Sequence, residues 1–345
     1  MTFRSGILKS AVCRILLAAS ALCLAPCACL FAATATPQAV AVPAAPKGPL
    51  LRVRKISESI MTSHDGRTYR IVVSAPSGPP PKNGFPVLYV LDGDAWFGTA
   101  VEIVKMREYE KLAPTIVVGV GSPQHFFFDP ARSRDFTAPG SADPDLDASE
   151  VGGADVFLDF LDKRVRPWVR TRQQIDPARQ ILFGHSFGGL FVLHAMFKQP
   201  EAFAVYLAAS PYVGFSGKAI LHEATAFQSN PGRKTPRLLV TVGELEASPS
   251  PALVDDYRRY FTEHPEVIAG QSVDEAIDTL FKGSADKSDK RADIRAMVDR
   301  LAGSGVNASF VQFAGEEHMS SAVSALNRGI PFALRPDLGP QGSPP

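Results

Sequence analysis

The sequence predicts an α/β fold in which a mainly parallel central sheet carries helices on both faces. Short apolar runs rich in branched residues recur along the chain, and such runs are typical of strands that are buried on both faces. Between them lie segments whose apolar residues repeat at helical spacing. Repeated strand–helix units predict a parallel sheet. Ligands of such sheets bind at the carboxyl ends of the strands.

The expected strands share branched and aromatic apolar residues and are short. The first follows a turn signal, His64-Asp65-Gly66, and is rich in residues that favour strands. In chain order, the expected strands are residues 67–74, 86–91, 114–120, 179–183, 205–209, 237–242 and 309–313.

Helices are expected between these strands. Residues 156–165 carry aromatic and aliphatic side chains along one stripe, and residues 190–197 continue from a glycine-rich turn. Residues 272–275 resemble a capping box, which predicts a helix through Phe281. A further helix is expected over residues 294–301, whose apolar residues recur at helical spacing.

The composition excludes several classes of protein. The 345 residues carry 36 Lys+Arg against 35 Asp+Glu, and this balance gives no reason to expect a nucleic-acid partner. All four cysteines lie in the first 30 residues, which excludes a disulfide framework, a cysteine nucleophile and a thiolate metal site in the folded domain. No metal or organic cofactor is expected, because the sequence lacks H-E-x-x-H and has no G-x-G-x-x-G after its first strands.

The chain begins with an expected signal peptide, residues 1–35. A basic start precedes an uncharged stretch at residues 15–33, and Ala33-Thr34-Ala35 fits a cleavage site. We expect export to a bacterial periplasm and no stable membrane span after cleavage. A retained membrane anchor, secretion and lipid attachment at Cys27 are the alternatives.

The remaining chain divides into three parts. Residues 36–50 are rich in proline and alanine and are expected to form an extended linker. Residues 51–335 form one folded domain, and residues 336–345 form a flexible tail. The sequence leaves the oligomeric state open.

The motif that most strongly indicates a catalytic function is Gly184-His185-Ser186-Phe187-Gly188. It has the form G-x-S-x-G and lies between an expected strand and an expected helix. This is the context of a nucleophile elbow, in which a sharp turn lifts a serine hydroxyl above the sheet. The glycines are needed because strand and helix pack closely there. Ser186 is therefore the candidate nucleophile.

A serine hydroxyl needs a base and an orienting acid. His318 is the candidate base, because it follows the last expected strand and comes after Ser186 in the chain order Ser, acid, His. Glu246, in the loop after residues 237–242, is the first candidate for the acid. Glu244 is the alternative, and Asp255 or Asp256 is a more distant one.

An oxyanion hole is expected from two backbone N–H groups. One belongs to Phe187, directly after the nucleophile. The other belongs to Asp94, in the loop after residues 86–91, where Gly93 permits a close approach. Trp96 and Phe97 follow in the same loop and are expected to line the substrate pocket, with simple packing in the core as the alternative.

Together these motifs resemble the enterochelin-esterase-like branch of the esterase D family, within the α/β-hydrolases. The resemblance covers roughly residues 55–335, and its matching stretches are residues 87–96, 116–121, 132–139, 176–189, 208–211, 242–246 and the loop of His318. It implies the α/β-hydrolase fold and hydrolysis of a small-molecule ester, with trilactone siderophores as the first candidate substrates. Members with a Gly-x-x-Glu segment are taken to use its glutamate as the acid, which supports Glu246, whereas some siderophore esterases are described with a Ser–His dyad.

The resemblance also implies substrate contacts. Arg132 and Arg134 are candidate substrate-binding residues, since an arginine of this loop lies near the substrate in relatives and a guanidinium suits an anionic siderophore. Arg134 could instead form a structural ion pair with Asp135. His185, beside the nucleophile, is a further candidate contact.

One departure from the family pattern is a helix-rich insertion at about residues 250–302. We expect it to overhang the pocket and to narrow the choice of substrate. The activity expected overall is that of a serine carboxylic-ester hydrolase that works through an acyl-enzyme. The alternatives are a carbohydrate or feruloyl-type esterase, an acyltransferase on the same fold, and a non-catalytic binding protein.

Overall fold

The computed structural model describes residues 54–144, 146–227, 236–247, 251–268, 270–281 and 290–335. The expected signal peptide, linker and tail therefore lie outside the described residues. Within them, eight strands form one sheet in the order β1-β2-β4-β3-β5-β6-β7-β8. The strands are β1 (Lys55–Thr62), β2 (Thr68–Ala75), β3 (Phe85–Leu91), β4 (Ile116–Gly121), β5 (Ile175–His185), β6 (Val205–Ala209), β7 (Arg237–Gly243) and β8 (Asn307–Phe313).

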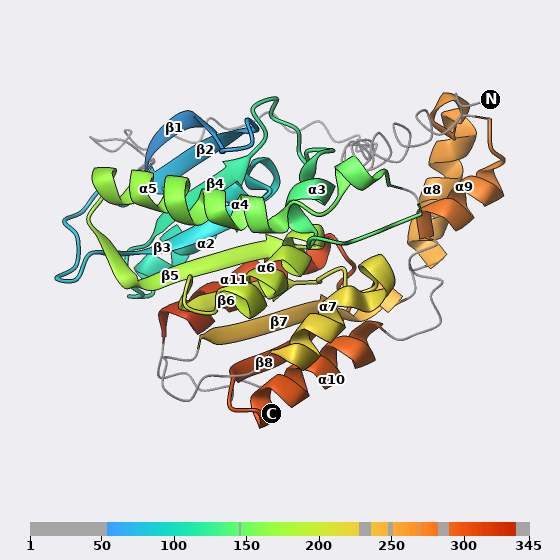
Figure 1. Ribbon diagram of the computed structural model, residues 1–345. Helices are drawn as coiled ribbons and strands as arrows, with labels where there is room; N and C mark the ends of the chain where they lie inside the picture. The colour runs from blue at the N-terminus through green and yellow to red at the C-terminus, as the bar shows by residue number, and fades with distance from the viewer. Residues whose placement is uncertain are drawn as a thin grey trace, which may run out of the picture.

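The sheet is mainly parallel, as expected. Strands β4, β3, β5, β6, β7 and β8 pair in parallel, whereas β1 and β2 join one edge in antiparallel pairing (Figure 1). Every expected strand overlaps an observed one. β1 was not foreseen, because an edge strand exposed over most of its length carries polar residues that give no apolar signal.

Helices cover both faces of the sheet, which confirms the predicted fold class (Figure 1). The α-helices are α2 (Gly93–Tyr109), α3 (Arg132–Phe136), α4 (Ala154–Phe160), α5 (Arg166–Arg172), α6 (Phe187–Lys198), α7 (Phe215–Ala226), α8 (Pro251–Glu263), α9 (Val273–Phe281), α10 (Lys290–Gly303) and α11 (Ser320–Leu334). The short turns are η2 (Ala148–Glu150), η4 (Glu244–Ala247), η5 (Pro265–Ile268) and the π-helical η3 (Leu161–Val165), which joins α4 to α5. None of the helices in the described part of the chain has the length and apolar character that a membrane crossing requires.

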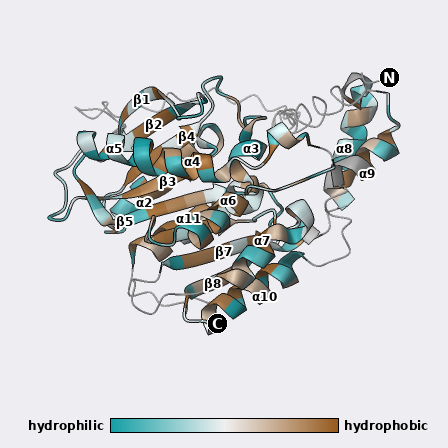
Figure 2. Ribbon diagram, in the orientation of Figure 1, coloured by the Kyte–Doolittle hydropathy of each residue, from teal (hydrophilic) through white to brown (hydrophobic). Residues whose placement is uncertain are grey.

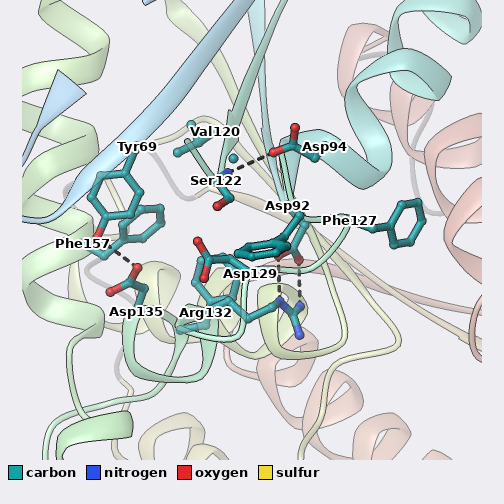
Figure 3. A pocket seen from close by; sticks show the side chains of 13 residues that line it. Tyr69, Asp92, Asp94, Val120, Ser122, Phe127, Asp129, Arg132, Asp135 and Phe157 are labelled. Atoms are coloured by element: carbon teal, nitrogen blue, oxygen red, sulfur yellow. Dashed lines mark hydrogen bonds and ion pairs between the residues drawn. The ribbon is translucent and has the colours of Figure 1, made fainter. Parts of the chain in front are cut away.

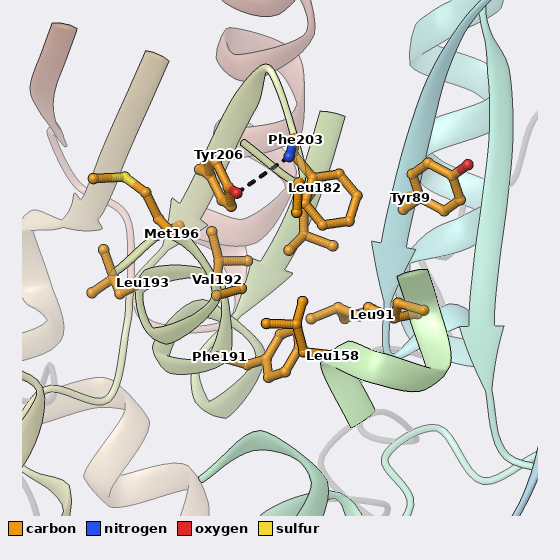
Figure 4. Close-up of a cluster of buried hydrophobic side chains, with 14 of the residues drawn as sticks. Tyr89, Leu91, Leu158, Leu182, Phe191, Val192, Leu193, Met196, Phe203 and Tyr206 are labelled. Atoms are coloured by element: carbon orange, nitrogen blue, oxygen red, sulfur yellow. Dashed lines mark hydrogen bonds between the residues drawn. The ribbon is translucent and has the colours of Figure 1, made fainter. Parts of the chain in front are cut away.

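Two hydrophobic cores hold the layers together, one on each face of the sheet (Figure 2). The first lies under α4, α6, α7 and α10, where Leu158 and Phe191 pack toward Leu182 of β5 (Figure 4). The second lies under α2 and α11, around Trp96 and Leu326. Burial on both faces explains why the central strands are apolar throughout, and it makes β5 a rigid base for the residues that follow it.

The segment between β7 and β8 is helical. Its helix α9 begins at the predicted capping box, in which Glu275 N–H donates to Ser272 Oγ at 3.2 Å and Ser272 N–H donates to Glu275 Oε2 at 2.8 Å. Helices α8 and α9 pack against each other around Phe261 and Ile277. In Figure 1 this pair stands apart from the sheet, on the side toward which β5 and β7 point. α10 instead packs beside β8 and α7.

A buried histidine ties three of the covering helices together. His194 of α6 lies with Nδ1 2.7 Å from Glu223 Oε2 on α7 and Nε2 2.9 Å from Asp155 Oδ1 on α4. Burial lowers the pKa of this imidazole, but the hydrogen bonds and charges of the two carboxylates outweigh burial and raise the pKa of His194 above its usual value. The helix that follows the nucleophile is therefore anchored to α4 and α7 through this imidazole.

Candidate active site

Ser186 occupies the sharp turn between β5 and α6. Its backbone has φ 60° and ψ −118°, a strained conformation for a residue other than glycine. The turn is held by the bond from Ser186 N–H to Ala209 O at 3.0 Å. A Cβ on Gly184 would lie only 2.9 Å from Cα of Gly188, so the close approach of strand and helix requires glycine there. This geometry is that of a nucleophile elbow.

His318 and Glu246 are brought together by the loops that follow β8 and β7. His318 Nδ1 lies 3.1 Å from Glu246 Oε2. The other carboxylate oxygen, Oε1, accepts hydrogen bonds from Gly243 N–H at 2.5 Å and from the Ser210 hydroxyl at 2.5 Å. Ser321 Oγ, on α11, lies 3.2 Å from the same oxygen.

These contacts keep Glu246 ionised although its side chain is only 15% exposed. Burial by itself raises the pKa of a carboxyl group, but the hydrogen bond and charge of His318, with the bonds from Ser210 and Gly243, lower the pKa of Glu246 below its usual value. An ionised carboxylate on Nδ1 fixes the imidazole tautomer, which leaves Nε2 as the nitrogen that can take a proton.

Glu244 has a different role. Its carboxylate accepts a hydrogen bond from Gly315 N–H at 2.8 Å, and its own carbonyl oxygen accepts one from Arg291 at 2.7 Å. Glu244 is exposed and holds the loop that leads to His318, without touching the imidazole. The structure therefore places Glu246, and not the alternative Glu244, in the position of the orienting acid.

His318 lies next to the nucleophile turn. Its ring centroid is 4.5 Å from that of His185, the residue directly before Ser186. Among the described residues Ser186 Oγ has no hydrogen-bond partner, and the bond to His318 is not formed. Such bonds are often long or misaligned without substrate and close when it binds. The side chain of His318 is 44% exposed and can make this adjustment.

The two expected oxyanion donors lie in the first turns of two helices. Phe187 begins α6, and Asp94 is the second residue of α2, so neither N–H has an acceptor within its own helix. The two helix starts are neighbours, because Asp92 Oδ2 lies 3.3 Å from the position that a Cβ on Gly188 would take. A Cβ on Gly93 would lie 2.9 Å from Val120 N, which explains the glycine there. Helix N-termini favour negative charge, as an oxyanion hole requires.

Three of the expected substrate contacts pack against other parts of the protein. His185 is fully buried, and Trp96 is 5% exposed within the core under α2. Phe97 packs over Gly119 of β4. The physical reason is that α2 begins at Gly93 itself, so the residues expected to form a loop are the first turns of a helix that face the sheet.

The two arginines expected to contact substrate are paired with carboxylates of the protein. Arg132 binds Asp92 with two parallel bonds, Nε to Oδ1 and Nη2 to Oδ2, both 2.7 Å, and Nη2 also lies 3.2 Å from His185 O. Arg134 forms ion pairs with Asp65 at 3.1 Å and with Asp135 at 3.5 Å, which is the structural alternative. Each guanidinium group is therefore engaged in at least one ion pair within the protein.

A pocket adjoins the Asp92–Arg132 pair (Figure 3). It lies among β2, β4 and α3, and neither Ser186 nor His318 lines it. Its lining is aromatic and acidic: Tyr69, Asp92, Asp94, Val120, Gly121, Ser122, Phe126, Phe127, Asp129, Arg132, Asp135, Phe136 and Phe157. The run of aromatic residues after β4 was the sequence signal for this pocket, and it was overlooked.

Sequence reasoning also missed two buried hydroxyls, those of Ser210 and Ser321, which lie 2.7 Å apart beside Glu246. The backbone of Ser210 has φ 43° directly after β6. No local pattern distinguishes such serines from surface ones. Within the described part of the chain, no group of histidine, cysteine or acidic side chains is arranged to hold a metal ion.

Comparisons with known proteins point to esterases. The model of a family described as putative esterase matches residues 62–294. A ferri-bacillibactin esterase of Bacillus subtilis is 34% identical over 286 residues, which cover 79% of this chain and 87% of the relative. A siderophore triacetylfusarinine C esterase of Aspergillus fumigatus is 32% identical over 79% of this chain and 91% of its own length. Among solved structures, a siderophore hydrolase from Aspergillus nidulans superposes with a TM-score of 0.68 at 30% identity, covering 81% of this chain and 94% of that one.

Proposed function

The chain belongs to the putative esterase family and is a carboxylic ester hydrolase of the α/β-hydrolase fold, and from this premise we propose that it hydrolyses siderophore esters through an acyl-enzyme on Ser186. The family resemblance expected from the motifs is thereby confirmed. The observation that carries the proposed mechanism is the Glu246–His318 pair, which two separate loops deliver beside the nucleophile elbow.

In this mechanism Ser186 Oγ attacks the ester carbonyl while Nε2 of His318 takes its proton. Glu246 holds the imidazole orientation and stabilises the imidazolium that forms. The N–H groups of Phe187 and Asp94 stabilise the negative charge on the carbonyl oxygen. The proton then passes to the leaving alkoxide, and a water molecule, activated in the same way, releases the acid and restores Ser186.

The names of the relatives support siderophores as the substrate class, because bacillibactin and triacetylfusarinine C esterases cover most of this chain. The location of the protein is a separate proposal. Export to the periplasm rests on the basic start and the uncharged stretch at residues 15–33 of the sequence. Cell fractionation of the tagged full-length protein tests it, and a cytoplasmic, uncleaved product contradicts it.

Turnover of matched esters tests the proposed function. We expect the purified protein to hydrolyse p-nitrophenyl butyrate, and Ser186→Ala to lose at least about 10³-fold in kcat. Catecholate trilactones and hydroxamate triesters, each with and without Fe(III), should be cleaved with higher kcat/KM than feruloyl esters. Preference for feruloyl esters, or transfer to an added sugar acceptor, would refute the siderophore assignment. Activity no greater than that of Ser186→Ala on every ester would indicate a binding protein.

We propose that the α8–α9 pair restricts which esters the protein accepts. The pair belongs to the segment between the Glu246 and His318 loops and has a small core of its own. Replacing this pair by a short linker should broaden the range of esters cleaved. An unchanged ranking of kcat/KM across the same esters would contradict this assignment.

A further inference from the structure

His185 links the nucleophile strand to the loop of the candidate base. It is the last residue of β5 and is fully buried. Its Nε2 lies 2.7 Å from the carbonyl oxygen of His318. Because a carbonyl oxygen can only accept, Nε2 must carry the proton, and the ring is the Nε2–H tautomer.

The packing around this ring keeps it neutral. It lies between Trp96, at 5.4 Å between ring centroids, and His318, at 4.5 Å. Its other nitrogen, Nδ1, is buried and has no partner among the described residues. A proton on Nδ1 would be an unpaired donor and a buried charge close to Arg132. Burial, then the charge of His318 and the charge of Arg132, lower the pKa of His185 well below its usual value.

The carbonyl group of His318 is held from two sides. His185 donates from β5, and the Ser321 hydroxyl donates from α11 at 2.8 Å. The backbone of His185 is in turn fixed by Arg132, whose guanidinium joins His185 O to Asp92 at the start of α2. The main chain of the base is therefore tied to the turn that carries the nucleophile and to the start of α2, the helix that carries the Asp94 N–H.

We propose that His185 is a positioning residue for His318: its Nε2–H holds the His318 carbonyl and its ring supports the His318 imidazole, so that this imidazole faces Ser186. This inference rests on the proposed function, because it assigns His318 the role of base. It differs from a general packing role, which any side chain of similar volume would fill.

Two amide substitutions at His185 separate the effect of its hydrogen bond from the effect of its side-chain volume. The nitrogen of glutamine is as many bonds from Cα as Nε2 of histidine, so His185→Gln can keep the bond to His318 O. The nitrogen of asparagine corresponds to Nδ1, so His185→Asn cannot reach that oxygen. The same two changes at His222, an exposed residue of α7, are the matched control.

The readouts are kcat and KM for p-nitrophenyl butyrate and the rate at which a fluorophosphonate labels Ser186, normalised to folded protein. We expect His185→Asn to lower kcat and the labelling rate by about 10–100-fold with KM little changed, the scale of a misplacement near 1 Å. His185→Gln should recover most of both rates. Equal rates for the asparagine variant and the wild type overturn the inference, and so do equal losses in the two variants. A wild type without esterase activity overturns the proposed function instead.

Histidine-labelled wild-type protein provides a test that does not depend on whether the variants fold. The ¹⁵N shifts of His185, assigned by the loss of its signals in His185→Gln, should show a protonated Nε2 and an unprotonated Nδ1 from pH 5 to pH 8. If His185→Gln does not fold, the assignment is made through the backbone of the wild type. A ring that is protonated on Nδ1, or that titrates in this range, overturns the inference.

Discussion

Gly243, the last residue of β7, is the position at which a single methyl group should damage the site most. A Cβ built there lies against the carbonyl oxygen of Glu316 and 2.9 Å from its carbonyl carbon, with Glu246 Oε1 at 3.1 Å. The backbone of Gly243 is not in the left-handed region, so alanine has no conformational penalty of its own. Gly243→Ala therefore perturbs the packing of the His318 loop on β7 and crowds the carboxylate of Glu246.

The size of the effect follows from these distances. Ordinary contacts of a Cβ begin at 3.4 Å, so the carbonyl carbon of Glu316 must retreat by at least about 0.5 Å and its oxygen by more. The same oxygen accepts a hydrogen bond from Leu245 N–H at 3.0 Å, which the movement stretches. Glu316 lies two residues before His318, so the imidazole is displaced by up to about 1 Å. A misplacement of this size costs about 100-fold in rate, and overpacking costs about 1–3 kcal/mol in the free energy of unfolding.

The assay is kcat for p-nitrophenyl butyrate beside urea denaturation of the same preparation. Gly98→Ala, in α2, is the control, because its added methyl group meets nothing within 4 Å. It should keep kcat at about the wild-type value and gain up to about 1 kcal/mol of stability. Wild-type kcat in a folded Gly243→Ala variant would refute the reasoning, because the His318 loop would then tolerate displacement.

Three further predictions follow from the ionised groups. Glu246→Gln should lower kcat by about 10³–10⁴-fold, the scale of a lost orienting acid, whereas Glu244→Gln should leave kcat near the wild-type value; equal losses would contradict the assignment of the acid. Arg132→Met leaves the buried carboxylate of Asp92 unpaired and should cost about 3–5 kcal/mol in urea denaturation; a loss below about 1 kcal/mol would show that the pair is dispensable. Because the pKa of His194 is raised in the folded protein, its stabilisation is fully present below pH 6.5 and is lost as pH rises through the folded-state pKa. The Tm of the wild type should therefore fall more than that of His194→Gln between pH 6.5 and about pH 9, and parallel curves would contradict this.

Much of the fold could be read from local patterns. A strand buried on both faces must be apolar along its whole length, so residues 86–91 and 237–242 were recognisable without any partner. The elbow at Ser186 was recognisable from local sequence as well. Its glycines avoid a steric clash between residues only five positions apart or fewer. β1 escaped recognition because its residues are exposed at the edge of the sheet and carry no such constraint.

The position of His318 could be expected from chain order, because it follows the last strand. The choice between Glu246 and Glu244 was not decidable in that way, since both carboxylates follow the same strand. It depends on which side chain turns toward the imidazole and which turns toward Gly315. Packing between separate loops made that choice.

His185 and Arg132 show most clearly what the sequence leaves open and the tertiary structure decides. His185 was a candidate substrate contact because it adjoins Ser186, and Arg132 was one because the family resemblance implied it. A side chain's accessibility, however, depends on what other segments place over it: α2 and the His318 loop bury His185, and Asp92 neutralises Arg132. The pattern of residues along the chain thus specifies which helices and strands form and their order in the sequence. Only the folded arrangement specifies which side chains face solvent and which hold the site in place, because burial and ion pairing arise between residues far apart in sequence.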